Sequence, residues 1–356
     1  MGNDLNKKLA ERLKGLRLNR EIRIMEVCGT HTTEFFRTGV KDLFPRNLIL
    51  VDGPGCPVCV TPNEYLDRAI EIGKQYRPII ATFGDMIKVP SSTSSLVKEK
   101  AKGMDIRIVY SPMNALEFAE ANPGAEVMFL SVGFETTAPA EAATVLEAKR
   151  RNIKNFSILP GNKLTPPAVE ALLVAGEVKI DGFILPGHVS AVIGTVAWRF
   201  ISGRYGKPCV VAGFDASDLM MGMLTLVDLI QKNKNITVNQ YSRVVREEGN
   251  RTAVELLYQV FTASDSRWRG IGVIPGSGLA IRNEYADFDA AQKFPVTPPA
   301  PEEAKGCRCG ELLRGLITPP QCGLYGKACT PEEPVGPCMV SMEGPCAAYY
   351  KYWSGR

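Results

Sequence analysis

The sequence lacks the features that mark membrane, exported and nucleic-acid-binding proteins. No apolar run approaches the roughly 20 residues that a membrane-spanning helix needs. Residues 1–8 have neither the apolar core nor the small-residue cleavage site of a secretory signal. The net charge is only +4, and no block of basic residues stands out. We therefore expect a cytoplasmic protein that binds neither a membrane nor nucleic acid.

Length and pattern indicate more than one α/β domain. A chain of 356 residues exceeds one ordinary hydrophobic core, and 45% hydrophobic residues is typical of globular proteins. Short apolar runs end in a Gly- or Pro-containing tip, and a helix-like stretch follows each of them. Such a repeated unit favours parallel sheets covered by helices. The runs lie at 22–27, 48–51, 78–82, 106–110, 127–132, 156–159, 182–185, 209–212 and 270–274.

We predict two doubly wound parallel-sheet domains and a small cysteine-rich C-terminal domain. The first domain is expected at residues 1–118 and the second at 119–290. The run at 270–274 is expected to stay in the second domain or to return to the first. A proline-rich linker at 292–305 leads into the third domain, residues 300–356. In doubly wound folds, ligands bind at the carboxyl ends of the strands, so the Gly tips should surround a shared cleft.

Ten cysteines are the most unusual feature of the composition. In a reducing compartment, clustered cysteines are more often metal ligands or redox groups than structural disulfides. Three lie early in the chain, and six crowd into the last 50 residues. Cys209 stands alone in an apolar run, where we expect a small buried side chain. This distribution predicts two separate thiol sites.

The first predicted site combines Cys28 with Cys56 and Cys59. Cys28 directly follows the first apolar run, and the segment with Cys56 and Cys59 directly follows the second. Because consecutive strands tend to be neighbours in space, the two tips can bring three sulfur atoms to one place. Thr61 and Pro62 are expected to cap and open a helix just beyond. Thiols near a helix N-terminus have lowered pKa values, which favours the thiolate that binds metal.

The residues alone leave several interpretations of this site open. The thiols bind a metal, or the Cys-x-x-Cys pair is a thioredoxin-like redox couple, or the cysteines are inert packing. Structural zinc normally needs four ligands, and only the three cysteines and His31 are at hand. His31 is either a hydrogen-bonded structural residue or a group that orients a metal ligand. His188 and Glu135, also at strand tips, are candidate cleft residues or serve the first turn of a helix.

The six C-terminal cysteines predict an iron–sulfur cluster. No histidine and no zinc-ribbon pair accompanies them, which makes zinc a weaker choice. A 4Fe–4S cluster needs four thiolates, and we assign these to it: Cys307, Cys322, Cys329 and Cys346. Cys307 and Cys309 are awkward joint ligands of one iron, so Cys309 and Cys338 are left as a nearby redox dithiol or as alternative ligands. The other interpretation is a tail held by disulfides, which a cytoplasmic setting disfavours.

The candidate residues lie in longer motifs. These are CGTHT at 28–32, GPGCPVC at 53–59, GFETT at 133–137, LPGHVS at 185–190 and GPCMVSMEGPC at 336–346. Together they resemble the HypD family of hydrogenase maturation factors. The resemblance runs from about residue 20 to the C-terminus, and its motifs are long and specific.

The resemblance implies a scaffold that assembles the Fe(CN)2CO group of nickel–iron hydrogenases. Proteins of this family form a complex with the small chaperone HypC, and together they carry an iron atom that receives two cyanides and one carbon monoxide. The cyanide comes from HypE, with HypF upstream. Matched by motif, Cys28, Cys56 and Cys59 are the iron-site cysteines, and the tail is the 4Fe–4S domain. In this scaffold the tail cluster is expected to pass electrons through the Cys309/Cys338 dithiol and to reset a Cys56–Cys59 disulfide. The alternative function is a 4Fe–4S-linked thiol–disulfide oxidoreductase.

Overall fold

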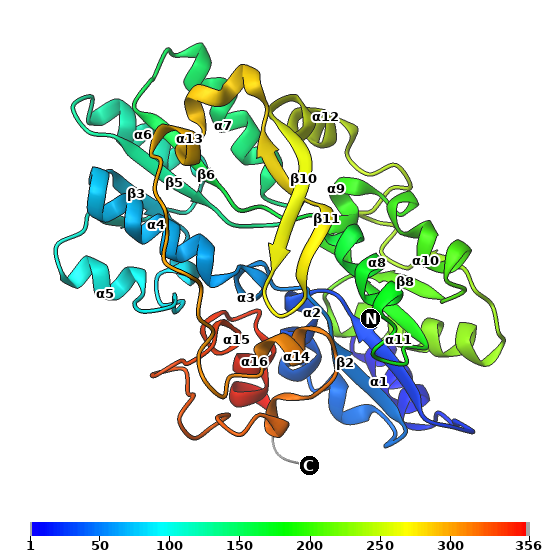
Figure 1. Cartoon of the computed structure of the whole chain (residues 1–356). Helices are drawn as coiled ribbons and strands as arrows, with labels where there is room; N and C mark the ends of the chain where they lie inside the picture. The colour runs from blue at the N-terminus through cyan, green and yellow to red at the C-terminus, as the bar shows by residue number, and fades with distance from the viewer. Residues whose placement is uncertain (1, 354–356) are drawn as a thin grey trace.

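The computed structural model of the chain describes residues 2–353 and has the predicted α/β fold, with two parallel sheets (Figure 1). The first sheet consists of β1 (Ile22–Glu26), β2 (Leu48–Asp52), β7 (Gly182–Pro186), β8 (Cys209–Ala212) and β9 (Thr237–Asn239). Its strand order is β2-β1-β7-β8-β9, and every pairing is parallel. All but β9 are buried along nearly their whole length, as expected of apolar strands in a sheet covered on both faces.

The second sheet is also parallel and has the order β4-β3-β5-β6. Its strands are β3 (Ile79–Thr82), β4 (Ile106–Ile108), β5 (Val127–Ser131) and β6 (Phe156–Pro160). Every residue of β3 and β5 is buried. In both sheets the sequence motifs follow directly on the carboxyl ends of strands, where the predicted cleft residues were expected.

Helices cover both sheets, and short helices also occur in the C-terminal segment. They are α1 (Gly2–Lys14), α2 (Gly29–Arg37), α3 (Pro57–Val60), α4 (Asn63–Tyr76), α5 (Leu96–Ala101), α6 (Pro112–Ala121), α7 (Ala138–Arg150), α8 (Thr165–Ala175), α9 (Gly187–Ile193), α10 (Arg199–Arg204), α11 (Ala216–Gln231), α12 (Arg251–Val260), α13 (Ala290–Lys293), α14 (Cys309–Leu313), α15 (Pro337–Val340) and α16 (Pro345–Tyr352). Short 3-10 helices occur at Val40–Leu43, Gly84–Met86, Val196–Trp198, Asn283–Phe288 and Pro319–Gln321.

Buried side chains form three large groups. One joins α1, α2 and α11 to one face of the first sheet, and another joins α6, α7 and α12 to one face of the second. The largest connects the other faces of both sheets with α4, α8 and the cysteine-rich tail. The tail is therefore part of the central hydrophobic packing rather than an appendage.

The strands are distributed over the two sheets in a way that the sequence did not indicate. The first sheet takes β1 and β2 from before residue 118 and β7 to β9 from after it. Residue 118 itself lies within α6, between two strands of the second sheet. The chain thus leaves the first sheet after β2 and returns to it at β7, instead of dividing once. Apolar runs identify strands but not their partners, and consecutive strands are neighbours in only about two-thirds of cases.

The strand predicted at 270–274 belongs to neither parallel sheet. It overlaps β11 (Gly272–Ile281), which pairs antiparallel with β10 (Phe261–Trp268) in a separate hairpin. The sequence prediction missed β10 because only its two end residues are buried, and most of the residues between are polar. The short, half-buried β9 was missed for a similar reason. In Figure 1 the yellow hairpin runs from the neighbourhood of α12 down to α14.

The cysteine-rich tail follows an extended segment. Residues 294–308 contain no helix or strand, in agreement with their proline content. The tail then packs beside α2, where the rings of Phe36 and Tyr349 lie 4.3 Å apart between centres. This packing holds α16 against α2.

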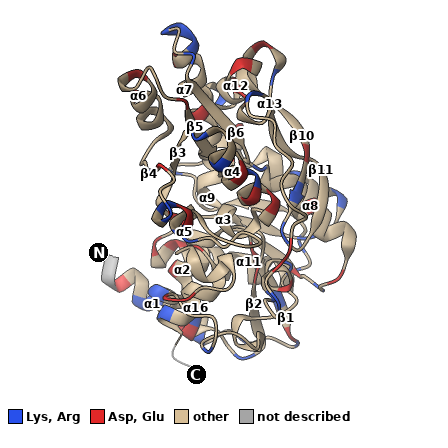
Figure 2. Cartoon of the chain, turned by 60° about the vertical axis from the view of Figure 1, so that its left-hand side comes forward, with Lys and Arg blue, Asp and Glu red and all other residues tan. Residues whose placement is uncertain are grey.

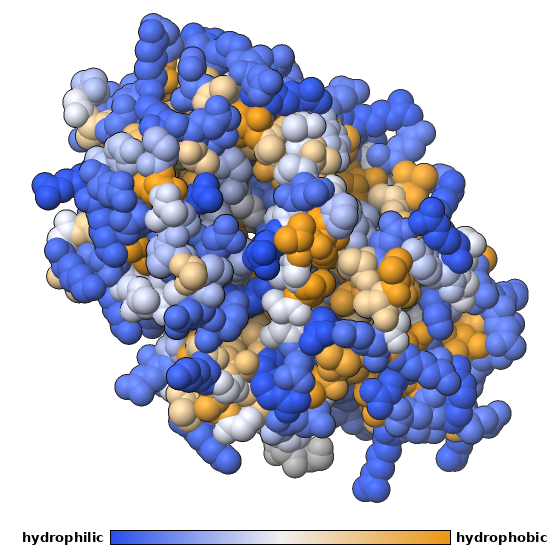
Figure 3. All heavy atoms as spheres, in the orientation of Figure 1, coloured by the Kyte–Doolittle hydropathy of each residue, from blue (hydrophilic) through white to orange (hydrophobic). Residues whose placement is uncertain are grey.

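The molecular surface is mixed in charge and polarity. None of the described helices combines the length and the apolar character needed to cross a membrane. Figure 2 shows Lys and Arg interspersed with Asp and Glu over the helices of both sheets. On the face seen in Figure 3, apolar residues form small groups that hydrophilic residues interrupt.

Glu141 is a buried carboxyl group that joins α7 to the ends of two strands. It accepts hydrogen bonds from the Ser131 hydroxyl at the end of β5 and from the Asn162 amide just after β6. Burial raises the pKa of Glu141 to about 7, although these hydrogen bonds act in the opposite direction. The group is therefore mostly protonated in the folded chain at mildly acidic pH.

We predict that Glu141→Gln reduces the pH dependence of stability. As the pH rises from 4.5 to about 7, the unfolded chain ionises Glu141 while the folded chain keeps it protonated, so stability falls in this window. Ionisation of Glu141 should lower the free energy of unfolding of the wild type by up to about 3 kcal/mol, and the variant should not show this loss. Urea unfolding midpoints at about pH 5 and about pH 7.5 provide the measurement.

The matched control is Glu147→Gln on the same helix. The side chains of Arg150 and Arg151 lower the pKa of Glu147 to about 2, so this group does not titrate in the window. Glu147→Gln should therefore leave the pH dependence of stability unchanged. An identical pH dependence in the wild type and in Glu141→Gln would contradict the prediction.

Candidate functional site

The carboxyl ends of β1 and β2 place the first two cysteine motifs side by side. The two strands are paired in parallel along their whole length. Beyond them, the amide of Gly29 donates a hydrogen bond to the carbonyl oxygen of Gly55 at 2.9 Å. A Cβ atom on Gly55 would overlap the amide nitrogen of Cys28, so only glycine fits there. The loops that carry Cys28 and Cys56 are therefore in direct backbone contact.

Cys56 and Cys59 are joined by a disulfide across the single turn of α3. Both residues are buried, and the amide of Cys59 points at the Cys56 sulfur, with N and Sγ 3.1 Å apart. Cys56 thereby caps α3. The N-cap predicted at Thr61 is wrong: its hydroxyl donates back to the carbonyl of Pro57 at 2.8 Å, and α4 begins only at Asn63.

The three predicted iron ligands are neighbours in the fold but do not form a metal site in this state. Within residues 2–353, no three Cys, His, Asp or Glu side chains are placed to hold one metal ion. The disulfide engages the sulfurs of Cys56 and Cys59, whereas Cys28 is a free, buried thiol. A three-sulfur site thus requires reduction of the disulfide. That the three sulfurs then meet at one iron stays a prediction.

Cys28 lies in a buried and acidic environment. It occupies the N-cap of α2, a position that by itself would lower a thiol pKa. Burial, followed by the nearby carboxylates of Glu343 and Glu26, instead raises the pKa of the Cys28 thiol well above its usual range. Burial and negative charge therefore outweigh the helix. A thiol in such surroundings is protonated near pH 7 and gives up its proton when a cation takes its place.

Two buried carboxyl groups beneath Cys28 were not predicted from the sequence. Glu26, the last residue of β1, accepts hydrogen bonds from the Cys28 amide at 2.8 Å and from the Thr32 hydroxyl. Asp52, the last residue of β2, lies opposite Glu26, and burial raises the pKa of Asp52 to about 6. Lys41 is the cation nearby, and burial lowers its pKa to about 8. The signal available in the sequence was an acidic residue at the end of each of the two apolar runs.

The two histidines stack on the same phenylalanine ring. The ring centres of His31 and His188 lie 4.7 Å and 3.8 Å from that of Phe214. Nε2 of His31 donates to the carbonyl oxygen of Gly213 at 3.0 Å, since a carbonyl can only accept. Burial lowers the pKa of His31 to about 4, and its Nδ1 is buried without a partner among the described residues. The fold thus brings the histidines together, while their role at the iron site stays a prediction.

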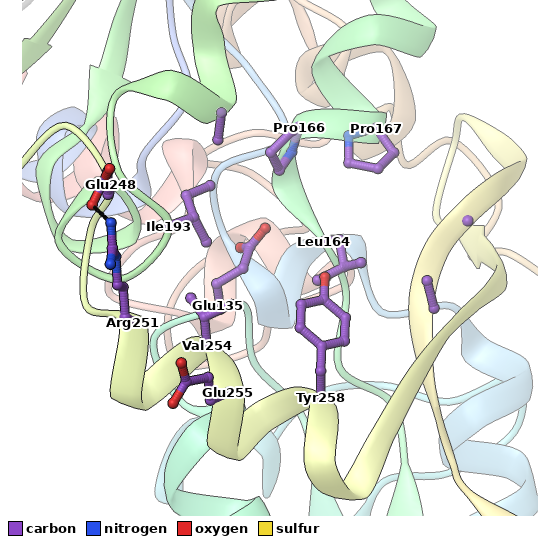
Figure 4. A pocket seen from close by; sticks show the side chains of 13 residues that line it. Glu135, Leu164, Pro166, Pro167, Ile193, Glu248, Arg251, Val254, Glu255 and Tyr258 are labelled. Carbon is purple, nitrogen blue, oxygen red and sulfur yellow. Dashed lines mark hydrogen bonds and ion pairs between the residues drawn. The ribbon is translucent and has the colours of Figure 1, made fainter.

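Glu135 lies at a separate pocket whose described lining includes no cysteine. This cavity of about 550 Å³ opens between α8, α9, α12 and the hairpin (Figure 4). The buried carboxylate of Glu135 accepts a hydrogen bond from the Thr165 amide at 2.8 Å. Burial raises the pKa of Glu135 to about 7. The structure does not place Glu135 with the thiols, so its predicted catalytic role stays a prediction.

Most of the tail cysteines surround one small cavity. Its thiol lining consists of Cys307, Cys309, Cys322, Cys329 and Cys346. The apolar side chains of Leu312, Leu324 and Met339 complete the wall. Each iron of a 4Fe–4S cluster takes one protein thiolate, so a cluster needs thiols that enclose a space rather than thiols that meet at a point. The donor set and the apolar wall fit such a cluster.

Cys309 is the centre of this thiol group. The thiols of Cys307, Cys338 and Cys346 lie within hydrogen-bond reach of its sulfur and lower its pKa well below the usual range. A Cβ atom on Gly336 would lie 2.5 Å from the Cys307 sulfur and 2.8 Å from the Cys309 sulfur, so glycine leaves room for both. Cys309 lines the cavity, and Cys338 contacts Cys309 without lining it. Which four cysteines bind the cluster stays a prediction.

The tail closes over the first thiol site. The sulfur of Cys59 lies 4.0 Å from the carbonyl oxygen of Pro337, the residue before Cys338. A Cβ atom on Gly29 would overlap the backbone of Glu343, so this part of the tail rests directly on the start of α2. In Figure 1 the red helices α15 and α16 lie close to α2 and α3, and the tertiary contacts agree. The two groups of thiols therefore adjoin each other in the fold.

We predict that Gly55→Ala displaces the Cys28 loop and lowers stability. The added methyl group overlaps backbone rather than a flexible side chain, so the loop must move, at a loss of about 1–3 kcal/mol. The thermal unfolding midpoint and the rate at which Cys28 reacts with a maleimide provide the measurements. Gly124→Ala, whose added Cβ meets nothing within 4 Å, should change neither. Wild-type stability and reactivity in Gly55→Ala would refute the close contact.

Known proteins are similar to this chain along nearly its whole length. The profile of the HypD family, described as "Hydrogenase formation hypA family", matches residues 4–353. The hydrogenase maturation factor HypD of Rhodobacter capsulatus is 45% identical over 354 residues, which cover 98% of this chain and 94% of that protein. HypD of Escherichia coli (strain K12) is 44% identical over 334 residues, 94% of this chain and 90% of the other. The hydrogenase expression/formation protein HupD of Azotobacter chroococcum mcd 1 is 44% identical over 344 residues, 95% and 91% of the two chains. Because the match runs through both sheets, the hairpin and the cysteine-rich tail, the chain belongs to the HypD family of hydrogenase maturation factors.

Proposed function

We propose that this chain matures nickel–iron hydrogenases by assembling their Fe(CN)2CO group. The iron atom is cargo, held by the thiolates of Cys28, Cys56 and Cys59 while the chain is in complex with HypC. HypE delivers the cyanide, and HypF acts upstream of HypE. Membership of the HypD family and the names of the relatives, which call them hydrogenase maturation factors, support this proposal.

The observation that carries the proposal is the backbone contact between the loops after β1 and β2. The hydrogen bond from Gly29 to Gly55 makes Cys28 a neighbour of Cys56 although the two are far apart in the sequence. The contact is made by strand pairing and by a glycine that nothing larger can replace. Three cysteines on two touching loops are suited to share one iron atom.

The ligand chemistry agrees with this assignment. Thiolates are soft donors, which suit ferrous iron that carries strong-field ligands such as cyanide and carbon monoxide. A three-thiolate site leaves coordination positions open, as sites that exchange ligands require. The open positions admit the diatomic ligands and a cysteine of HypC.

Iron binding first requires reduction of the Cys56–Cys59 disulfide, and we assign this step to Cys338 and Cys309. Cys338 gives its proton to Cys309 and attacks the Cys59 sulfur, the bond to Cys56 breaks, and Cys56 takes up a proton. Cys309 then attacks Cys338, which forms a Cys309–Cys338 disulfide and releases Cys59 as a thiol. Two electrons and two protons thus pass from one dithiol to the other. The 4.0 Å separation of the Cys59 sulfur from the Pro337 carbonyl oxygen supports this route.

The tail is assigned a resident 4Fe–4S cluster. The predicted ligands are Cys307, Cys322, Cys329 and Cys346. A bound cluster supplies single electrons. The chain contributes the enclosing thiols, and Leu312, Leu324 and Met339 keep water away from them. Tyr325 completes the wall on the side of the last helix, where its ring lies 6.3 Å from that of Tyr350.

Anaerobic co-purification with HypC tests the proposed function. With HypE, HypF and their substrates supplied, the complex should show infrared cyanide and carbonyl stretches, together with iron and labile sulfide. Cys28→Ala should lose the stretches because it removes one of three iron ligands, and should keep the labile sulfide of the tail. Cys209→Ala is the control, since this buried thiol contacts the Thr237 hydroxyl in the first sheet, and it should retain the stretches. Absence of the stretches from the wild-type complex would count against the proposal.

The disulfide in this structure favours a second candidate, a thiol–disulfide oxidoreductase. We predict that the chain does not accelerate the reduction of insulin by dithiothreitol, because Cys56 and Cys59 are only 1% and 0% exposed and a protein substrate does not reach them. The turbidity of precipitating insulin chains provides the measurement. Acceleration that survives Cys28→Ala but not Cys59→Ala would favour the oxidoreductase over the scaffold.

A further inference from the structure

The pocket between α8, α9, α12 and the hairpin is lined by segments that extend from both parallel sheets. Glu135 and Leu164 follow β5 and β6 of the second sheet, whereas Ile193 ends α9, which follows β7 of the first sheet. The pocket thus lies beyond the carboxyl ends of strands, where parallel-sheet folds bind their ligands. Its volume of about 550 Å³ is sufficient for a small molecule. The proposed iron site leaves this pocket unassigned.

The wall of the pocket combines apolar side chains with a few polar groups. Apolar side chains from three helices form most of the wall, among them Leu164, Ile193 and Val254. The carboxyl group of Glu135 and the hydroxyl group of Tyr258 are polar groups within this wall. Such a combination is typical of sites that bind the apolar part of a ligand and orient it through a few polar contacts.

Glu135 is the buried polar group of the pocket. The residue is only 2% exposed, and Figure 4 shows its carboxylate in the middle of the lining side chains. Burial raises the pKa of Glu135 to about 7. Burial, followed by the charge of Glu135, also raises the pKa of Tyr258. The carboxyl group and the phenol therefore lie close enough to influence each other.

The carboxylate of Glu135 does not have a full set of hydrogen-bond donors. Besides its own amide, it accepts hydrogen bonds from Thr165 alone among the described residues. The Thr165 hydroxyl lies 3.2 Å from one carboxylate oxygen and 3.1 Å from the other, but it has a single hydrogen to donate. The next two residues of α8, Pro166 and Pro167, have no amide hydrogen. An ionised carboxylate accepts about four hydrogen bonds, so this one has room for a further donor.

The lining carries an excess of negative charge. The exposed side chains of Glu248 and Arg251 form an ion pair with each other at the rim (Figure 4). Glu135, when ionised, and Glu255 add two further negative charges to the lining. The pocket should therefore favour a cation over an anion.

We propose that this pocket binds a small organic cation whose N–H groups donate to Glu135 and whose apolar body contacts Leu164 and Val254. A hydrogen bond between a charged donor and a carboxylate is stronger than one between neutral groups, and a low local dielectric strengthens it further. The ligand contacts segments that extend from both sheets. The proposal is independent of iron binding by the cysteines.

Titration calorimetry with benzamidine tests the proposal on the full-length chain, purified anaerobically. Benzamidine joins a planar cation to an apolar ring, benzamide has nearly the same shape without the charge, and benzoate has the opposite charge. At about pH 8, above the pKa of Glu135, benzamidine should bind. Benzamide should bind about tenfold more weakly, because it lacks the charge-assisted hydrogen bond, and benzoate should give no heat of binding.

Two variants locate the binding in this pocket. Glu135→Gln removes the negative charge and should weaken benzamidine binding about tenfold. Val254→Trp fills the cavity from α12 without removing a hydrogen bond of Glu135, and should weaken binding to a similar extent. It also serves as the test if Glu135→Gln does not fold, as judged by circular dichroism.

Glu141→Gln is the matched control. Burial raises the pKa of Glu141, like that of Glu135, to about 7, but Glu141 contacts Ser131 and Asn162 and does not line the pocket. This variant should bind benzamidine as the wild type does.

The outcomes are decisive whether or not the chain binds iron. No heat from millimolar benzamidine with the wild type, or equal affinities for benzamidine and benzamide, overturns the proposal. Wild-type affinity in a folded Glu135→Gln or in Val254→Trp, or an equal loss in Glu141→Gln, also overturns it. Weaker binding confined to the two pocket variants, together with the preference for benzamidine, supports it.

Discussion

The parallel pairing of β1 with β2 and the hydrogen bond between Gly29 and Gly55 beyond it are the constraint on which the rest of the structure depends. Parallel strands end at the same edge of a sheet, so whatever follows them meets there. Glycine at position 55 lets the two loops touch through their backbones. The thiols are thereby placed by the pairing of the two strands and by the backbone contact between the loops that follow them.

Contacts with the tail and with the hairpin bury the sheet edge at which the loops after β1 and β2 meet. The tail lies over the start of α2 near Glu343, and the hairpin tip reaches the end of α3 through Arg269. Burial has an electrostatic consequence, since it raises the pKa values of Cys28 and Asp52 and keeps His31 neutral. An enclosed thiol that is protonated in the absence of metal exchanges its proton for the cation when the metal binds.

The sequence predicted those features that follow from local patterns. Apolar runs gave eight of the strands in the two sheets, and the positions of Cys28 and Cys56 directly after the first two runs predicted their proximity. Pairing between distant segments could not be predicted, because an apolar strand such as β7 carries no mark of its partner. The hairpin, with Arg269 at its tip, was not predicted because its first strand is polar. Glu26 and Asp52 were visible as acids at strand ends, but burial, which gives them their significance, is a property of the folded chain.

The central claim is that the sulfurs of Cys28, Cys56 and Cys59 converge on one iron once the disulfide is reduced. Crystals of the reduced, iron-loaded chain, measured on both sides of the iron absorption edge, test it most directly. The account predicts an anomalous peak within bonding distance of all three sulfurs, separate from the peak of the tail cluster. Iron found only in the tail, with the Cys28 sulfur turned away from the other two, would contradict it.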